Sequence, residues 1–152
     1  MNTALLRNMN ARVKPGDVVM HVGDFCCKGN DRGIAGTRTK AEEWERQLNG
    51  KWIHVLGNHD DNNGVKHGIE MAVVSMGGYK ALVQHRPIER ACEVPDFCDF
   101  VICGHIHEKW AEQKIDGIWN INVGVDVRRF FPLDDGEIVG IYEKTKRREA
   151  TK

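Results

Sequence analysis

Four short, mainly apolar segments of this chain each run into a glycine or histidine flanked by polar residues, and this repeated pattern restricts the fold most. The segments are Asp17–Val22, Lys51–Leu56, Tyr79–Gln84 and Asp99–Cys103. Their length and their β-branched or aromatic content predict strands. The first, DVVMHV, is mainly apolar and β-branched, which is typical of a strand in a sheet covered on both faces.

Helical patterns separate these strands. Apolar residues at helical spacing predict helices over Thr3–Val13 and Thr39–Leu48. A capping box of Asp134 and Glu137 predicts a last helix that extends to about Arg148. Strands with helices between them indicate an α/β protein in which the helices pack outside the sheets.

Two further strand pairs are expected as hairpins. Gly77-Gly78 joins Ile69–Ser75 to Tyr79–Gln84, and Asp116-Gly117 joins Trp110–Lys114 to Ile118–Val123.

Size, charge and cysteine content favour one ordinary domain over residues 1–152. The 22 basic residues balance 22 acidic ones, so no overall charge directs the chain to nucleic acid or to a membrane. A local basic tail at about 144–152 is interpreted as a solvated helix end. We expect a cytoplasmic protein for three reasons. The five cysteines include no C-x-x-C pair, no apolar segment is long enough to span a bilayer, and Met1–Lys14 carries no secretion signal.

Metal-binding residue types follow the predicted strands. In open α/β folds, sites form outside the carboxyl ends of strands, so these residues are expected to meet. Each is weak evidence alone, but together they offer a carboxylate, an amide oxygen and imidazoles, which suit Mn, Fe, Zn or Ni. The candidates are Asp24, Asn58, His85, His105 and His107.

Such a set favours hydrolytic chemistry. A carboxylate such as Asp24 can bridge two cations about 3.5–4 Å apart, which would clamp a phosphate and lower the pKa of a water between them. The sequence has no G-x-S-x-G elbow and no convincing cysteine nucleophile.

The ordered motifs Gly23-Asp24, Gly57-Asn58-His59-Asp60, His85 and Gly104-His105-Ile106-His107 resemble those of the calcineurin-like metallophosphoesterase family, in its small bacterial and phage type. The resemblance covers at least Asp17–Val125. It implies a four-layer α-β-β-α sandwich. It also implies hydrolysis of phosphate mono- or diesters, as a phosphatase or phosphodiesterase, by a metal-activated water.

The resemblance also implies a role for each motif residue. Asp24 would bridge two metals, one of which is completed by Asn58, His85 and His105. His107 would join Asp24 on the other metal. His59 would act as general acid or would stabilise the leaving oxygen, and Asp60 would orient His59.

One family motif is missing. Family members usually begin with a strand that ends in D-x-H, whereas Met1–Gly16 contains neither Asp nor His. The resemblance therefore implies a sandwich shortened by one N-terminal strand, one well-formed metal site, a second incomplete site and impaired activity. The strand Asp17–Val22 would then expose an edge, for which we expect a homodimer, a swapped strand or poor solubility.

Other polar residues are weaker candidates. Arg86 could contact a substrate phosphate. Asp126 could approach the site, but a role elsewhere is favoured. His21 and His54 are expected to pack in the sheet, and His67 to be exposed.

Two alternatives stay open. The chain could be a non-catalytic binding or scaffold relative with a vestigial metal site, or a protein in which one cation only pins loops together. The substrate is also open among cyclic nucleotides, nucleic-acid ends, phosphoproteins and small esters. The segments 26–36, 61–68 and 86–95 would form the pocket walls, and a membrane is not expected as partner.

Overall fold

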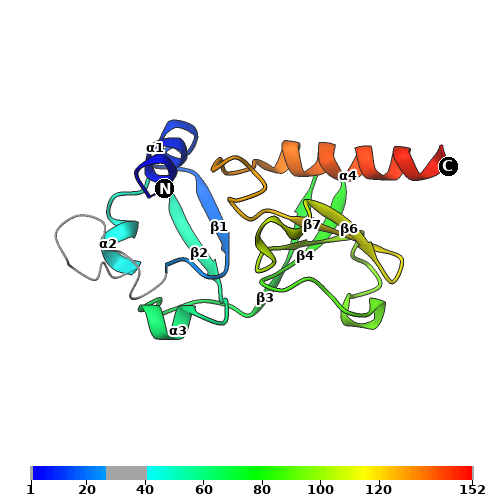
Figure 1. Ribbon diagram of the computed structural model, residues 1–152, viewed down its shortest axis with the longest axis horizontal. Coiled ribbons are helices and arrows are strands. Elements are labelled where there is room, and N and C mark those ends of the chain that lie inside the picture. Colours follow the sequence, from blue (N-terminus) through cyan, green and yellow to red (C-terminus); the bar gives the residue numbers. More distant parts are fainter. Residues whose placement is uncertain (1, 27–40, 152) are drawn as a thin grey trace.

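The computed structural model describes residues 2–26 and 41–151, which form two sheets that lie side by side with helices around them (Figure 1). The smaller sheet pairs β1 (Val18–Val22) with β2 (Lys51–Val55) in parallel. Helix α1 spans Asn2–Arg12 and α2 spans Ala41–Glu45, so both expected N-terminal helices are present. Residues 39 and 40 of the second, and the expected wall loop beyond Cys26, lie outside the described residues.

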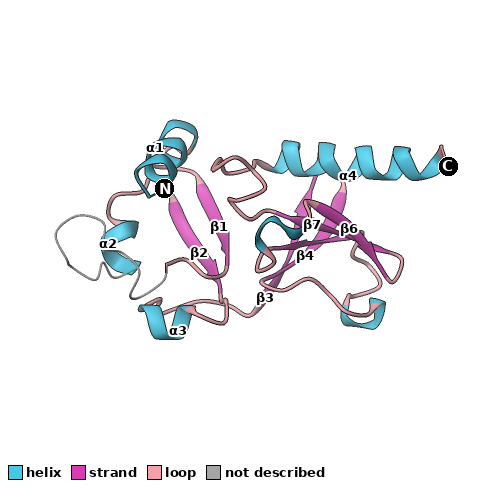
Figure 2. Ribbon diagram, in the orientation of Figure 1, coloured by secondary structure: helices cyan, strands magenta, loops and turns pink. Residues whose placement is uncertain are grey.

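The larger sheet has five strands in the order β3-β4-β5-β7-β6 (Figure 2). Both predicted hairpins are confirmed, because β3–β4 and β6–β7 are antiparallel pairs. The central pairs β4–β5 and β5–β7 are parallel. The strands are β3 (Met71–Met76), β4 (Tyr79–Gln84), β5 (Phe100–Cys103), β6 (Glu112–Ile115) and β7 (Ile118–Asn122).

Alternate residues of β4 and β5 fill two cores, one on each face of the larger sheet. Ala81, Val83, Phe100 and Ile102 join Val22 and Val55 of the smaller sheet in the inner core. The opposite faces of the same strands carry a second core, formed with two residues from the segment that follows β4. Its buried members are Leu82, Ile88, Val94, Val101 and Cys103.

The last helix, α4, spans Asp135–Ala150 and packs on the inner face of the larger sheet. The Tyr142 ring stacks on Phe100 with centroids 4.4 Å apart. The predicted capping box opens this helix, since Asp134 accepts the Glu137 backbone N–H and Glu137 accepts that of Asp134. Arg12 of α1 binds Glu137 at 2.8 Å and thereby ties the two helices together.

The layers therefore follow the expected order with one difference. Helix α2 lies outside the smaller sheet, and the larger sheet comes next (Figure 1). The far face of the larger sheet is packed against buried residues from 86–95, a segment that includes the short helix η1 (Ala91–Glu93). Helix α4 lies on the inner face instead. No helix in the described ranges is long and apolar enough to cross a membrane.

The two sheets meet at the carboxyl ends of their strands. Leu56 donates its backbone N–H to Ile69 at 2.8 Å as the chain passes from the smaller sheet to the larger. Gly104, just after β5, donates its N–H to the carbonyl of His85, just after β4, at 2.9 Å. The polar motifs that follow β1, β2, β4 and β5 are thus gathered in one region.

Candidate metal centre

Three of the five predicted metal ligands converge on the Nε2 atom of a fourth, His85. This atom lies 3.3 Å from Oδ2 of Asp24, 3.2 Å from Oδ1 of Asn58 and 3.1 Å from Nδ1 of His105. His85 is buried, and Asp24 is about one-fifth exposed, so the group lies at the edge of the interior. The structure brings together residues that are up to 81 positions apart, which the strand-end pattern predicted.

The other ring nitrogen of His85 is held by the backbone. Nδ1 lies 2.9 Å from the carbonyl oxygen of Val22 at the end of β1. Because a carbonyl only accepts, Nδ1 must carry the proton. In a neutral ring, Nε2 then presents a lone pair toward the carboxylate of Asp24. This pairing is repulsive unless a proton or a metal cation lies between the two, so the donors are arranged in a way that can accept a cation.

Asp60 holds the two loops that carry Asp24 and Asn58. Its side chain is fully buried, and Oδ2 accepts the backbone N–H of Asp24 at 2.9 Å and that of Gly57 at 2.7 Å. Oδ1 accepts the N–H of Phe25 at 2.8 Å. The expectation that Asp60 orients His59 is therefore corrected: its contacts are to backbone N–H groups that the strand ends leave unpaired.

Two glycines allow these loops to approach each other. A Cβ at Gly57 would lie 2.4 Å from both the backbone N and Oδ1 of Asp24, and a Cβ at Gly23 would lie 2.1 Å from Nδ1 of His85. Real Cβ contacts do not reach such distances, so any larger residue must displace a predicted ligand.

The backbone at three of the predicted ligands is left-handed. Asp24, His105 and His107 have φ values of 57°, 66° and 49°. Such values are uncommon outside glycine and cost energy, and they gather at functional sites. The chain turns sharply at both histidines, and η2 (His107–Lys109) starts there.

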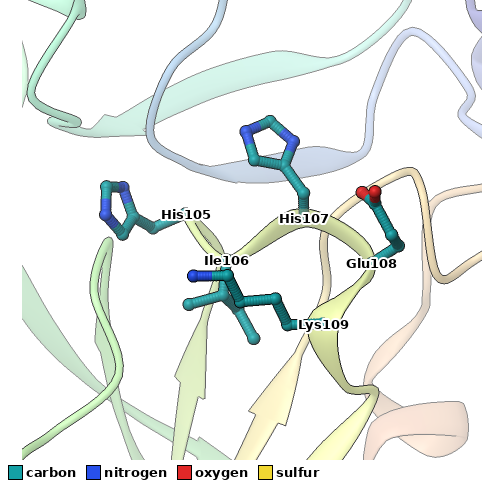
Figure 3. A pocket seen from close by; sticks show the side chains of 5 residues that line it. All are labelled: His105, Ile106, His107, Glu108 and Lys109. Atoms are coloured by element: carbon teal, nitrogen blue, oxygen red, sulfur yellow. The ribbon is translucent and has the colours of Figure 1, made fainter.

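His107 consequently belongs to a different group of side chains. Its Nδ1 lies 2.9 Å from Oδ2 of Asp126, and the two form with Glu108 a cluster whose ligand atoms all lie within 4.8 Å of one another. Figure 3 shows His107 and Glu108 on one side of the segment, with Ile106 and Lys109 on the other. His105 and His107 line a shared pocket of about 290 Å³. A joint role of His107 with Asp24 stays a prediction.

His59 and Arg86 lie at the rim of the site. His59 is exposed, and its backbone N–H donates to Oδ1 of Asp24 at 3.0 Å, which places its backbone beside the group. Arg86 is exposed directly after His85. Burial lowers the pKa of His105, and the nearby His85 and Arg86 lower it further, which favours the neutral imidazole that binds metal.

The two strand histidines pack as expected. His21 and His54 lie with Phe25 and Trp52 in an aromatic cluster, where the His21 and Phe25 centroids are 5.1 Å apart. Burial lowers the pKa of His21 to about 4. His54 is buried with Nε2 at 2.9 Å from Glu45. His67 is exposed. None of these three belongs to the converging group found among the described residues.

Cys103 precedes the Gly104-His105 turn but offers no thiolate. It is fully buried, and burial raises the pKa of its thiol to about 12. The site therefore depends on carboxylate, amide and imidazole groups.

Comparison with known proteins shows the family of this chain. The Calcineurin-like phosphoesterase superfamily domain matches residues 1–135. The chain belongs to this superfamily. An uncharacterized protein of Methanocaldococcus jannaschii is 30% identical over 149 residues, which are 96% of this chain and 77% of that protein. The crystal structure of a protein of unknown function from Aquifex aeolicus superposes with a TM-score of 0.63 at 24% identity. That match covers 92% of this chain and 84% of the other.

Membership confirms the α/β calcineurin-like fold and places the chain among metal-dependent phosphoester hydrolases. The residues present fit the family's metal. Asp24, Asn58, His85 and His105 offer oxygen and nitrogen donors around one point, where Nε2 of a neutral His85 can present its lone pair to a metal. The sequence pattern missed Asn122 and Glu108, which hold and flank His107.

Proposed function

We propose that this chain hydrolyses phosphate mono- or diesters with the help of a divalent transition metal held by Asp24, Asn58, His85 and His105. The observation that supports this proposal most is that Asp24, Asn58 and His105 approach Nε2 of His85 to 3.1–3.3 Å. A metal bound there would act as a Lewis acid on the phosphate and on water. The donor set accepts Mn, Fe, Zn or Ni, and manganese is the ion we would test first.

The chain's own residues fix the geometry. The Val22 carbonyl sets the His85 ring so that Nε2 faces the other donors, and Asp60 keeps the Asp24 and Asn58 loops in register. These contacts are made within the protein before any substrate arrives. Preorganised donors need no rearrangement during the reaction, which is how such sites favour the transition state.

Two exposed groups would act on the substrate. His59 is exposed and its backbone is tied to Asp24, so its imidazole would give a proton to the leaving oxygen. The Arg86 guanidinium would attract the phosphate and hold its oxygens. His105 also lines a surface pocket of about 290 Å³ with Ile106, His107, Glu108 and Lys109.

The test is hydrolysis of p-nitrophenyl phosphate and bis-p-nitrophenyl phosphate with added Mn²⁺. His85→Asn keeps an N–H donor toward the Val22 carbonyl but removes Nε2, so activity should fall at least about 100-fold. His67→Asn is the matched control, since His67 is exposed and outside the group, and it should keep full activity. Wild-type protein that binds Mn²⁺ but hydrolyses neither ester would favour a vestigial or structural site instead.

A further inference from the structure

We propose that the outer edge of β3 pairs with β3 of a second copy of this chain, so that the two larger sheets join into one. In the described part of the chain, Met71–Met76 pairs with β4 and with no other strand. Ile69, just before it, is already bonded to β2 through its backbone N–H and carbonyl, each at 2.8 Å, so the free edge starts at Met71. In an antiparallel pair, every second residue turns its backbone N–H and C=O away from the partner strand. The outer edge of β3 therefore presents a row of groups that a further strand can bind.

The side chains at this edge are apolar and exposed on one face. Met71 is 55% exposed and Val73 is 45% exposed. Val74 and Met76, which point the other way, pack in the inner core. Because alternate residues of a strand face opposite sides, the two exposed side chains share the far face of the sheet. An added strand would cover these side chains and pair the backbone beside them.

The other edge of the same sheet is protected by charge, whereas the β3 edge is not. β6 carries Glu112 and Lys114 among its four residues, and charged side chains commonly block pairing at a sheet edge. The sequence of β3, MAVVSM, has no charged residue. β1, the edge expected from the sequence to be open, also has no Asp, Glu, Lys or Arg. However, only Val18 of its five residues is exposed, so its side chains are largely covered already.

The charges around β3 favour a second copy in antiparallel orientation. A two-fold axis places the start of one β3 beside the hairpin end of the other. The start follows Glu70, which is exposed. The hairpin end carries Lys80, and Lys146 of α4 lies 5.5 Å from the Tyr79 ring centroid at the same end. Opposite charges would then lie at both ends of the pair, with no like charges between them. The pairing uses the β3 edge of both copies, so assembly stops at two.

The test is the molar mass in solution, measured by light scattering and by analytical ultracentrifugation over a range of concentrations. We expect the wild type to form a dimer of twice the 17.2 kDa chain. Val73→Lys and Met71→Lys each place a charge where the second copy would cover it, so each should weaken the dimer at least about tenfold. Val18→Lys is the matched control, because Val18 is an exposed valine on the other uncharged edge strand, and it should keep the wild-type dimer.

Two results would overturn the inference. One is a wild type that stays monomeric at every concentration. The other is a dimer of wild-type affinity in V73K and M71K; if V18K is then monomeric, the copies meet at β1 instead. Circular dichroism identifies a lysine variant that does not fold, and the other variant at β3 then decides. Mn²⁺ binding by the same samples reports on the metal centre separately, so the proposed function does not depend on this outcome.

Discussion

The carboxylate of Asp60 accepts the backbone N–H of Asp24 at 2.9 Å, across 36 residues of sequence. The same buried side chain accepts two more N–H groups, from Phe25 and Gly57, so one residue joins the loops after β1 and β2. The positions of Asp24 and Asn58 relative to each other therefore depend on a residue that contacts neither of their side chains.

Replacement of Asp60 by alanine should destabilise the fold. Three partly buried N–H groups would lose their acceptor, and each such loss costs about 1–3 kcal/mol, so we expect a decrease of about 3 kcal/mol or more in the free energy of unfolding. Urea unfolding measures it. Asp61→Ala is the matched control, because Asp61 is exposed, and it should change stability by about 0.5 kcal/mol or less. Equal stability of the two variants would contradict the role of Asp60.

The sequence predicted where ligands would gather better than how they would point. Strand ends that carry Asp24, Asn58, His85 and His105 follow from apolar segments and the glycines after them, and these four do meet. The direction of His107 depends on left-handed φ values at two histidines, which no residue pattern reveals.

The sequence also did not predict the contacts between side chains and backbone groups far away in the chain. The resemblance implied that Asp60 orients His59, but two of the N–H groups that it binds, those of Asp24 and Phe25, lie on another strand end. Likewise, the buried Asn122 reads in the sequence as the end of a strand. Only the arrangement of the chain shows that it supports His107.

Gly57→Ala should disable the metal centre. The new Cβ would lie 2.4 Å from two atoms of Asp24, its backbone N and its Oδ1. Neither atom can move away without displacing a ligand and disrupting the site. We expect Mn²⁺ affinity, measured by calorimetry, to fall at least about tenfold. Gly16→Ala is the control, since no atom lies within 4 Å of its added Cβ and its φ is not left-handed. Unchanged affinity in G57A would show that the loops can separate freely.

Acid should destabilise the protein through His21. Burial lowers the folded-state pKa of this residue to about 4, against an ordinary value of 6.5. Between these values the unfolded chain takes up a proton that the folded chain does not. The stability is therefore complete above about pH 6.5 and declines as the pH falls toward 4. Urea unfolding at several pH values should show a shallower decline for His21→Phe, and the His67→Asn control should keep the wild-type slope. Identical slopes in wild type and His21→Phe would refute this account.

Substitution of His59 should separate catalysis from metal binding. His59→Gln should leave Mn²⁺ affinity within about twofold, because the imidazole is exposed and outside the converging group. Turnover of phenyl phosphate, whose leaving group needs a proton, should fall about 100-fold, which is typical for loss of a general acid. Turnover of p-nitrophenyl phosphate should fall much less. The same loss for both esters would exclude a proton-donor role for His59.

The most direct test of the metal centre is anomalous diffraction from crystals grown with Mn²⁺. We predict a peak at bonding distance, about 2.0–2.3 Å, from Nε2 of His85 and Nδ1 of His105, with Asp24 and Asn58 completing its surroundings. The same peak should be missing in His85→Asn crystals. A fully loaded crystal with no anomalous peak among these four side chains would contradict the metal centre and the hydrolytic function that depends on it.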